Sequence, residues 1–237
     1  MITGIVVALP DELGTLTAKK VSKGHSLFIA DAILVVCAGV GPQNARAAAE
    51  LLVSKGATQL ISWGCAAALS PLLKPGDLTL ADKLLDADYH ELPMDLHWQS
   101  SAKTILAETL TVASGCLVES TSMIATGRQK KQIYSATDAI VLDMESAAVA
   151  KTANQHGLPF LAIRAIVDPA SMDLPKAIAY AANGQGDIVL SKLLLFLLLH
   201  PLELPQLIRL GLNFRAATKT LTQVASHLHK LAALPHG

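Results

Sequence analysis

The sequence predicts a single-domain α/β fold, in which helices flank a central, mixed but mostly parallel β-sheet and a helical extension follows at the C-terminus. Runs rich in Val and Ile alternate with alanine-rich helical stretches to about residue 170, and this βαβ order is typical of a largely parallel sheet. After about residue 186 only helical patterns follow. We therefore expect an α/β domain over residues 1–185 and an apolar helical segment packed on it over residues 186–237.

The first elements are two strands, a helix and a third strand. Each strand is a short apolar run closed by a turn signal. Pro42 in the first turn and Gly56 just past the end bound the helix. A loop of small residues is expected after the third strand. The elements lie at 2–9, 33–38, 42–55 and 59–63, and the loop at 64–68.

The second half of the α/β region repeats this alternation. Helical periodicity is followed each time by a short extended segment, and Gly157 stops the last of these helices. The expected helices lie at 101–113, 128–135 and 146–155, and the extended segments at 117–120, 139–142 and 160–167.

The composition is that of a tightly packed globular protein. Hydrophobic residues make up 51% of the 237 positions and charged residues only 16%. A formal net charge of zero, without a basic stripe, argues against nucleic acid as a partner. Three isolated cysteines and no signal-peptide pattern indicate a reducing compartment. The longest apolar run, 193–199, is far shorter than the roughly 20 residues of a spanning helix. We expect a cytoplasmic protein.

Polar groups follow four of the predicted strands, where ligands gather in such folds. Each has an ordinary explanation as a helix cap, a turn or a first-turn carboxylate. Together, three acidic positions at strand ends suit cleavage at the anomeric carbon of a sugar, because an oxocarbenium-like transition state favours nearby negative charge and needs an acid and a base. The groups are Asp11-Glu12, Gly39-Val40-Gly41, Asp143-Met144-Glu145 and Asp168-Pro169.

Other chemistries lack their motifs. The Gly39-Val40-Gly41 turn has no third glycine and no acidic residue ends the next strand, so it is not a dinucleotide fingerprint. As a tight turn at a helix start, it could instead hold an anion or a sugar oxygen through backbone N–H groups. The eight histidines show no metal-ligand spacing, and no GxSxG elbow is present. We expect neither a metal nor a redox cofactor.

Five segments resemble, in order, the purine/uridine phosphorylase superfamily, and they are most similar to its adenine nucleosidases for methylthioadenosine and S-adenosylhomocysteine. The resemblance spans about residues 1–170 and implies a nucleoside phosphorylase-like fold, a small-molecule nucleoside substrate and a homo-oligomer. The segments are GIVVALPDEL, AGVGPQNARAAAELLVSKGATQLISWGCAAAL, KPGDLTLAD, VLDMESAAVA and PFLAIRAIVDP.

The resemblance assigns roles to the acidic residues. Glu12 would activate the water nucleophile, and Asp168 would donate a proton toward N7 of the departing purine. Glu145 would hold the ribose hydroxyls, with Met144 packed against the sugar. Asp143 would be structural. Asp168 must then carry a proton near neutral pH, which requires burial or a neighbouring charge to raise its pKa.

The base and the nucleophile would be bound by loops. Met123, in place of the family's stacking aromatic residue, and Ile124 would contact the base. A thioether packs on a purine more loosely than an aromatic ring does. The nucleophile or an anion would lie at loops that contain Gly39, Gly41, Gly64 and Cys65.

One departure from the family bears on the nucleophile. Phosphorolytic members place an arginine three residues before a Ser or Thr, whereas this chain has Ser62 and Cys65 there. A phosphate dianion would lose its charge-assisted partner, which favours water. Arg46 and Arg128 could still supply a phosphate contact, so inorganic phosphate stays open as a co-substrate.

The tail, from DPASMDLP to LLLFLLLHPLELPQLIRLGLNFRAATKTL, resembles the hopanoid-associated branch of the superfamily. That branch is linked to removing adenine from the lipid-linked nucleoside adenosylhopane. The leading hypothesis is therefore a nucleosidase that releases adenine from a 5'-substituted adenosine. A phosphate-dependent purine nucleoside phosphorylase is the alternative within the fold, and a non-catalytic nucleoside-binding protein is the alternative of another class. The apolar tail is either a buried helix with an oligomer contact or a peripheral membrane surface.

Overall fold

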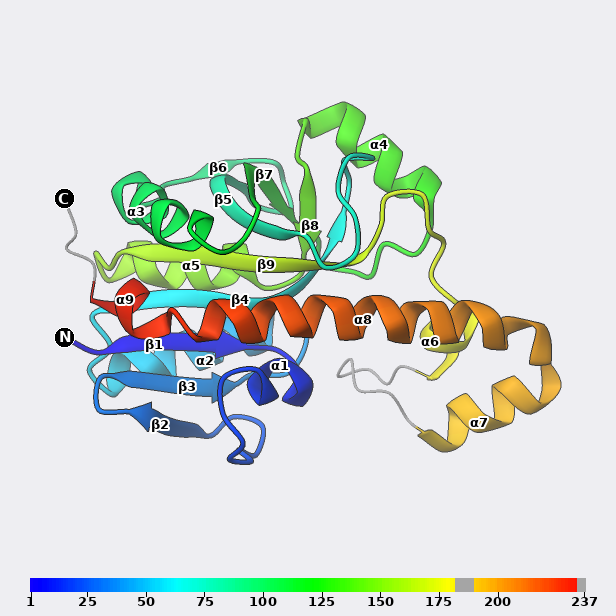
Figure 1. The fold of residues 1–237 in the computed structure, drawn as a ribbon, viewed down its shortest axis with the longest axis horizontal. Helices are drawn as coiled ribbons and strands as arrows, with labels where there is room; N and C mark the ends of the chain where they lie inside the picture. Colours follow the sequence, from blue (N-terminus) through cyan, green and yellow to red (C-terminus); the bar gives the residue numbers. More distant parts are fainter. Residues whose placement is uncertain (182–189, 234–237) are drawn as a thin grey trace.

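The computed structural model describes residues 1–181 and 190–233 (Figure 1). Over this part of the chain, nine strands form one mixed sheet with five parallel and four antiparallel pairings. The order is β2-β3-β1-β4-β8-β7-β5-β6, and β9 pairs with β4 and β5. The strands are β1 (Thr3–Val7), β2 (Ser26–Ala30), β3 (Ile33–Cys37), β4 (Gln59–Ala68), β5 (Leu78–Leu85), β6 (Glu91–Leu92), β7 (Val112–Glu119), β8 (Val141–Asp143) and β9 (Phe160–Asp168).

Helices cover both faces of the sheet. The helices are α1 (Pro10–Gly14), α2 (Pro42–Ser54), α3 (Leu96–Ala107), α4 (Gly127–Thr137), α5 (Ser146–Gln155), α6 (Lys176–Ala181), α7 (Leu190–Leu199), α8 (Leu204–Ala225) and α9 (Leu228–Ala232), with a 3₁₀ turn η1 (Pro201–Glu203). The predicted α/β class, its mixed, mostly parallel sheet and its helical C-terminal extension are confirmed.

Alternation along the strands divides the core into two layers. Val6 of β1 packs in the cluster that contains the buried alanines of α2 and α5. Its neighbours Ile5 and Val7 face the other way, into a cluster shared with α3, α8 and α9. The buried stripe of α8, which includes Leu221 and Val224, therefore closes one face of the sheet, as Figure 1 shows.

Several elements differ from the sequence prediction. The expected small-residue loop at 64–68 is the second half of β4, which runs to Ala68 between β8 and β9. The expected helix at 101–113 begins and ends earlier, as α3, and β7 takes over from Val112. Strands β2, β5 and β6 were not expected. The predicted domain boundary between 185 and 186 lies outside the described residues.

The C-terminal helices form two contrasting parts. The second half of α8 and α9 bury one face against the sheet. We call residues 190–214, which comprise α7, η1 and the first half of α8, the apolar arm. Figure 1 shows this arm reaching past the end of the sheet, beyond the strands that α8 covers. Its leucines are largely exposed in the single chain, so the helix is not buried within its own domain, and the oligomer contact that was expected with it stays a prediction.

Candidate functional site

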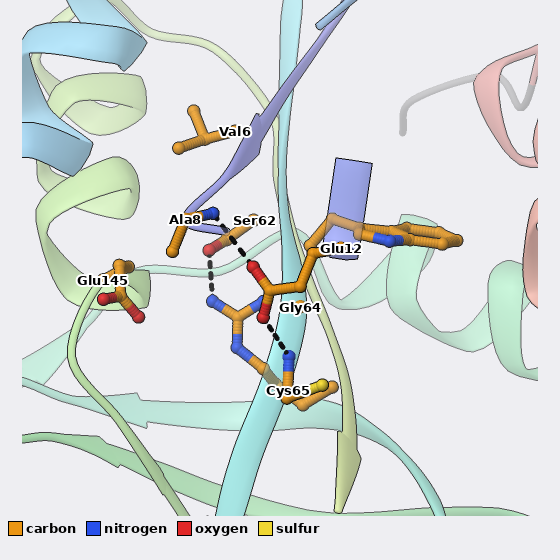
Figure 2. Close-up of a pocket in the computed structure, with 9 residues that line it drawn as sticks. Val6, Ala8, Glu12, Ser62, Gly64, Cys65 and Glu145 are labelled. Atoms are coloured by element: carbon orange, nitrogen blue, oxygen red, sulfur yellow. Dashed lines mark hydrogen bonds between the residues drawn. The ribbon is translucent and has the colours of Figure 1, made fainter. Parts of the chain in front are cut away.

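A small cavity lies where β1 and β4 meet the first turns of α1 and α5 (Figure 2). Parallel pairing of β1 with β4 and of β4 with β9 brings residues distant in sequence to this point. The cavity is lined by Val6, Ala8, Glu12, Ser62, Trp63, Gly64, Cys65, Glu145 and Arg164. The structure therefore brings together Glu12, Glu145, Gly64 and Cys65 of the predicted site residues.

The Glu12 carboxylate accepts hydrogen bonds from three backbone N–H groups. Oε2 accepts the N–H groups of Ala8 and Leu9, both at 3.0 Å, and Oε1 accepts that of Cys65 at 2.7 Å. Glu12 is the third residue of α1, so its bond to Leu9 caps that helix. The side chain is buried. Its position is therefore set by the main chain of two elements.

Position 64 in β4 requires a glycine. A Cβ at Gly64 would lie 2.5 Å from Oε1 of Glu12, so any side chain would displace the carboxylate. Glycine and alanine are poor strand formers, which made this stretch resemble a loop. Pairing to β9 on one side and β8 on the other overrides that preference. The strand carries the Cys65 N–H to Glu12.

Glu145 is held by the glycine turn that ends at α2. Its Oε1 accepts the Gly41 N–H at 2.8 Å, and Gly41 has a φ of 98°. A left-handed φ is open to glycine at little cost. The turn that was expected to hold an anion thus donates to a carboxyl group of the protein itself. Gly39 precedes it with a φ of 89°, and half-buried Met144 adjoins Glu145; neither lines the cavity.

Asp143 lies beneath the cavity in a buried network. Its Oδ2 is 2.7 Å from Nε of Arg164, and its Oδ1 accepts the N–H groups of Glu145 and Ser146 at the start of α5. Arg164 also donates to the hydroxyls of Ser62 and Ser146. Asp143 therefore caps α5 and neutralises Arg164, in line with the structural role expected for it. Since Glu119 accepts the Ala148 N–H, a second carboxylate satisfies the same helix start.

Burial dominates the electrostatics of the cavity. Burial raises the pKa of Glu12, against the Cys65 N–H and the Arg164 charge, which lower it. Burial and the nearby Asp143 charge raise the pKa of Glu145 well above its usual range. Burial also raises the pKa of Cys65, which disfavours the reactive thiolate form. Burial brings the pKa of Glu119 to about 7. The cavity concentrates carboxyl groups of high proton affinity around one guanidinium.

Asp168 lies apart from the cavity, at the end of β9. It comes four residues after Arg164, which corresponds to about 13 Å along a strand. Its Oδ1 is 2.6 Å from Nζ of Lys130, a fully buried lysine of α4. The same ammonium donates to the carbonyls of Pro169 and Met172, at 3.0 and 2.8 Å. Three acceptors match the three protons of a lysine.

The pKa of Asp168 reflects two opposed causes. Burial raises it, and the charge and hydrogen bond of Lys130 lower it, with burial the larger effect. Burial therefore shifts the Asp168 pKa in the direction that a proton donor needs, and the proton-donor role stays a prediction.

The expected base loop lies on the same side as Asp168. Met123 is exposed, and Ile124 is half-buried and packs on the small core cluster at β8. The loop is tied to the segment after Asp168, because Leu174 donates to the Ala125 carbonyl and Gly127 donates to the Asp173 carboxylate. Neither Met123 nor Ile124 lines the cavity. The candidate site thus has two parts, a Glu12–Glu145 cavity and an Asp168–Lys130 cluster beside the 120–127 loop.

Two residues of this site were not predicted. Arg164 lies in the RAIVDP segment, from which only Asp168 was predicted as a site residue. A buried arginine inside a strand has no sequence signal of its own. Lys130 belongs to a run of polar residues, RQKKQ, that is typical of a solvated helix face. The two arginines proposed for phosphate, Arg46 and Arg128, are exposed and lie outside the cavity.

One group among the described residues could bring three metal ligands within 4.8 Å of one another: Asp86, Asp88 and His90. It lies outside the cavity. The Asp86 carboxylate already takes the Lys151 ammonium at 2.7 Å and the N–H groups of Asp88 and His90. Asp88 and His90 are exposed, and Asp86 is already satisfied by these partners, so the group carries no assignment. That the chain needs no metal or redox cofactor stays a prediction.

Comparison with known families adds one match over most of the chain. The model of the phosphorylase superfamily matches residues 3–194. Among curated proteins, the 5'-methylthioadenosine/S-adenosylhomocysteine nucleosidase of Staphylococcus aureus (strain bovine RF122 / ET3-1) is 29% identical over 214 residues, which cover 78% of this chain and 89% of that protein.

Solved structures agree on the fold. The Helicobacter pylori 5'-methylthioadenosine/S-adenosylhomocysteine nucleosidase superposes with a TM-score of 0.70 at 17% identity, over 97% of this chain and 96% of the other. The Helicobacter pylori futalosine hydrolase gives a TM-score of 0.73 at 15% identity, over 96% and 97%. The Streptococcus pyogenes S-adenosylhomocysteine nucleosidase gives 0.71 at 20%, over 98% and 97%. Similarity at these identities establishes a shared fold.

Proposed function

The chain belongs to the phosphorylase superfamily, and from that premise we propose that it is a nucleosidase that hydrolyses the N-glycosidic bond of a 5'-substituted adenosine. The observation that carries the proposal is the pair Glu12 and Glu145, buried at one cavity, with Glu12 fixed by three backbone N–H groups. The nucleosidase name of the curated relative supports adenine release.

In the proposed reaction the bond between C1' of the ribose and N9 of adenine breaks, and its electrons leave with the purine. Asp168 donates a proton to N7, so the base departs as neutral adenine. Water adds to C1' and gives a proton to Glu12. The products are adenine and a 5-substituted ribose, and the two carboxyl groups exchange protons with solvent before the next turnover.

The two parts of the site suit these roles. The Glu12–Glu145 cavity would hold the water and the ribose hydroxyls, while the Asp168–Lys130 cluster beside the 120–127 loop would hold the purine. Glu145 binds hydroxyls whose contacts tighten as the ring flattens, which makes it a transition-state contact. Met144 would pack against the sugar, and Met123 and Ile124 against the base.

We favour water over phosphate as the nucleophile. Arg164 is the one cation that lines the cavity among the described residues, and its Nε is committed to Asp143 at 2.7 Å. A phosphate dianion would enter a cavity that already contains Glu12 and Glu145, without a free charge-assisted partner. Cys65 offers a protonated thiol where phosphorolytic relatives have a hydroxyl.

The finer proposal concerns the 5' substituent. We propose that it is long and apolar, as in adenosylhopane, which would place the reaction in hopanoid biosynthesis. Two observations support this proposal. The tail resembles the hopanoid-associated branch, and the apolar arm exposes leucines that an enzyme for a small soluble nucleoside would not need.

Adenine release tests the proposal. Purified protein is incubated with methylthioadenosine and with an adenosine that carries a long 5' alkyl chain, with and without inorganic phosphate, and adenine and the sugar product are quantified. Release without phosphate and a free reducing sugar are expected. Release that requires phosphate and yields a sugar 1-phosphate would establish a phosphorylase. Nucleoside binding without release would establish a binding protein.

A further inference from the structure

The apolar arm exposes an unusual amount of large apolar surface. Leu202 is 91% exposed and Leu198 80% exposed at the bend between α7 and α8. Proteins that stay monomeric in water rarely expose large contiguous apolar patches. The exposed apolar side chains of the arm are Leu194, Leu195, Leu198, Leu199, Leu202, Leu204, Ile208 and Leu212.

The outward face of α8 changes from apolar to basic along its length. Leu204, Ile208 and Leu212 recur every four residues, which places them on one helix face, opposite the buried stripe. Arg215 and Lys219 continue the same face toward the body of the protein, and both are exposed. The apolar part of the stripe thus lies at the far end of the arm and its cations lie at the root.

Charge separates the C-terminal helices from the rest of the chain. Residues 190–233 contain five Lys and Arg but a single acidic residue, Glu203. The Glu203 carboxylate accepts the Lys176 N–H at 3.0 Å. Residues 1–181 contain 14 Lys and Arg against 17 Asp and Glu. The C-terminal helices as a group are therefore positive and are attached to a weakly negative body, and three of their five cations, Arg215, Lys219 and Lys230, follow the arm.

We propose that the apolar arm binds the surface of an anionic lipid bilayer. The leucines at the bend, Leu198, Leu199 and Leu202, enter the boundary between headgroups and acyl chains. Arg215 and Lys219, and Lys192 at the start of α7, contact lipid phosphates. An apolar tip with a basic rim is the pattern of proteins that lie in a membrane interface.

The arm contacts the membrane without a spanning helix of its own. No single described helix is long and apolar enough to cross a bilayer, although Ser191–Leu199 and Pro201–Ala225 meet that requirement as a pair bent by 109°. A right-angled pair fits a surface contact, with the bend as the deepest point. A second copy of the chain is a poorer partner, because a two-fold contact through this face would bring basic rims of the same sign together.

The root of the arm contacts the segment that follows Asp168. Asn213 donates to the Met172 sulfur at 3.7 Å, and Met172 also accepts Lys130 through its carbonyl. The arm is thus joined to the Asp168–Lys130 cluster, which is the purine end of the proposed site. Membrane binding itself does not depend on the proposed function.

The test is co-sedimentation of the full chain with vesicles of phosphatidylcholine alone and of phosphatidylcholine with phosphatidylserine. We expect binding to the anionic vesicles that weakens with salt. The double variant Leu198→Glu/Leu202→Glu should lose at least tenfold in vesicle partitioning. Arg215→Gln/Lys219→Gln should lose the preference for phosphatidylserine, on the order of fivefold for each cation. The matched control is Leu72→Glu, at a leucine 83% exposed outside the arm, which should bind like the wild type.

Three outcomes would overturn the proposal: no vesicle binding by the wild type, equal binding by Leu198→Glu/Leu202→Glu, or a wild-type dimer that this variant converts to monomer without any vesicle binding. Adenine release from methylthioadenosine, assayed in parallel without vesicles, should be the same in all these variants. If the wild type binds anionic vesicles but releases no adenine, the proposed function would be contradicted and the membrane proposal would stand.

Discussion

At the Glu12 end of the candidate site the carboxylate is held by neutral backbone N–H groups, whereas at the Asp168 end it is held by a buried ammonium. A neutral backbone N–H group can donate to any hydrogen-bond acceptor, charged or neutral. A buried lysine needs its counter-charge, because an isolated charge in a protein interior is costly. The two ends should therefore respond alike in activity and differently in stability.

The largest expected effect is that of Asp168→Asn. Loss of the general acid should lower kcat by roughly 10²- to 10⁴-fold. Above the Asp168 pKa, where the carboxylate and Lys130 form an ion pair, the substitution also leaves Lys130 buried without an anion, which typically costs about 3–5 kcal/mol of unfolding free energy. Adenine release and urea denaturation measure the two losses.

A double variant separates them. Asp168→Asn/Lys130→Met removes both charges, so stability should recover toward the wild type while activity stays low. If Asp168→Asn were as stable as the wild type, the ion pair would be unimportant to the fold. If it kept full turnover, the proton-donor role would be wrong.

Glu12→Gln should match that activity loss without the stability loss. An amide cannot accept a proton from water, so we expect a decrease of at least about 10²-fold in kcat. The glutamine oxygen can still accept one or two of the three N–H groups, so unfolding free energy should change by no more than about 1–3 kcal/mol. Denaturation that is as severe as in Asp168→Asn would contradict the comparison between the two ends.

The pH profile should report both carboxyl groups. Glu12 must be ionised, so activity should fall as pH decreases through its raised pKa; Asp168 must be protonated, so activity should fall as pH increases through its raised pKa. Lys130→Met removes the charge that lowers the Asp168 pKa, so the alkaline limb should move to higher pH. The exposed neighbour Lys131→Met is the control and should leave the limb in place. A limb unmoved by Lys130→Met would show that Lys130 does not act on the Asp168 proton.

Gly64→Ala should have a smaller effect, confined to the Glu12 end. The added Cβ would meet Oε1 of Glu12 at 2.5 Å, so the carboxylate or β4 must shift, at about 1–3 kcal/mol. Activity should fall with it. Gly211→Ala, in α8 with no atom within 4 Å of the new Cβ, is the control and should stabilise by up to about 1 kcal/mol. Equal stability of both variants would mean that Glu12 or β4 can shift to accommodate the Cβ without a loss of unfolding free energy.

The sequence predicted elements whose signals are local. Helix α2 begins at Pro42 and ends just before Gly56, as these helix start and stop signals predict. Helix α5 spans the predicted residues 146–155. Strand β2 is a partly exposed edge strand without clear alternation, and β5 contains exposed Asp82 and Lys83 in its middle. The extension of β4 depends on partners far along the chain, which no local pattern contains.

The same distinction holds within the site. Glu12, Glu145 and Asp168 follow strands, and that placement is visible in the sequence together with a family resemblance. The partners that set their proton affinity are not visible. Lys130 is 38 residues from Asp168, and its buried ammonium is bonded to Asp168 and to the carbonyls of Pro169 and Met172 that follow it. Such a long-range ion pair needs the three-dimensional structure.

The smallest expected effect concerns Glu145, which belongs to the Glu12 end but is proposed to bind ribose rather than transfer a proton. Its pKa is raised by burial and by Asp143, so much of it is protonated in the free protein as pH falls toward and below that pKa. Ribose hydroxyls that donate to the carboxylate favour its ionised form, so binding should release a proton, and affinity for an inert nucleoside analogue should increase with pH through this range. Calorimetry in buffers of different ionisation enthalpy measures the proton count. Glu145→Gln should abolish the proton release. It should also lower kcat/KM for ribonucleosides by an amount equivalent to about 1–3 kcal/mol of transition-state stabilisation, because the ribose hydroxyl loses its acceptor. The loss for 2'-deoxynucleosides should be smaller. An equal loss for both sugars, with proton release retained, would place Glu145 outside the ribose site and leave Glu12 as the only carboxylate of the cavity in contact with substrate.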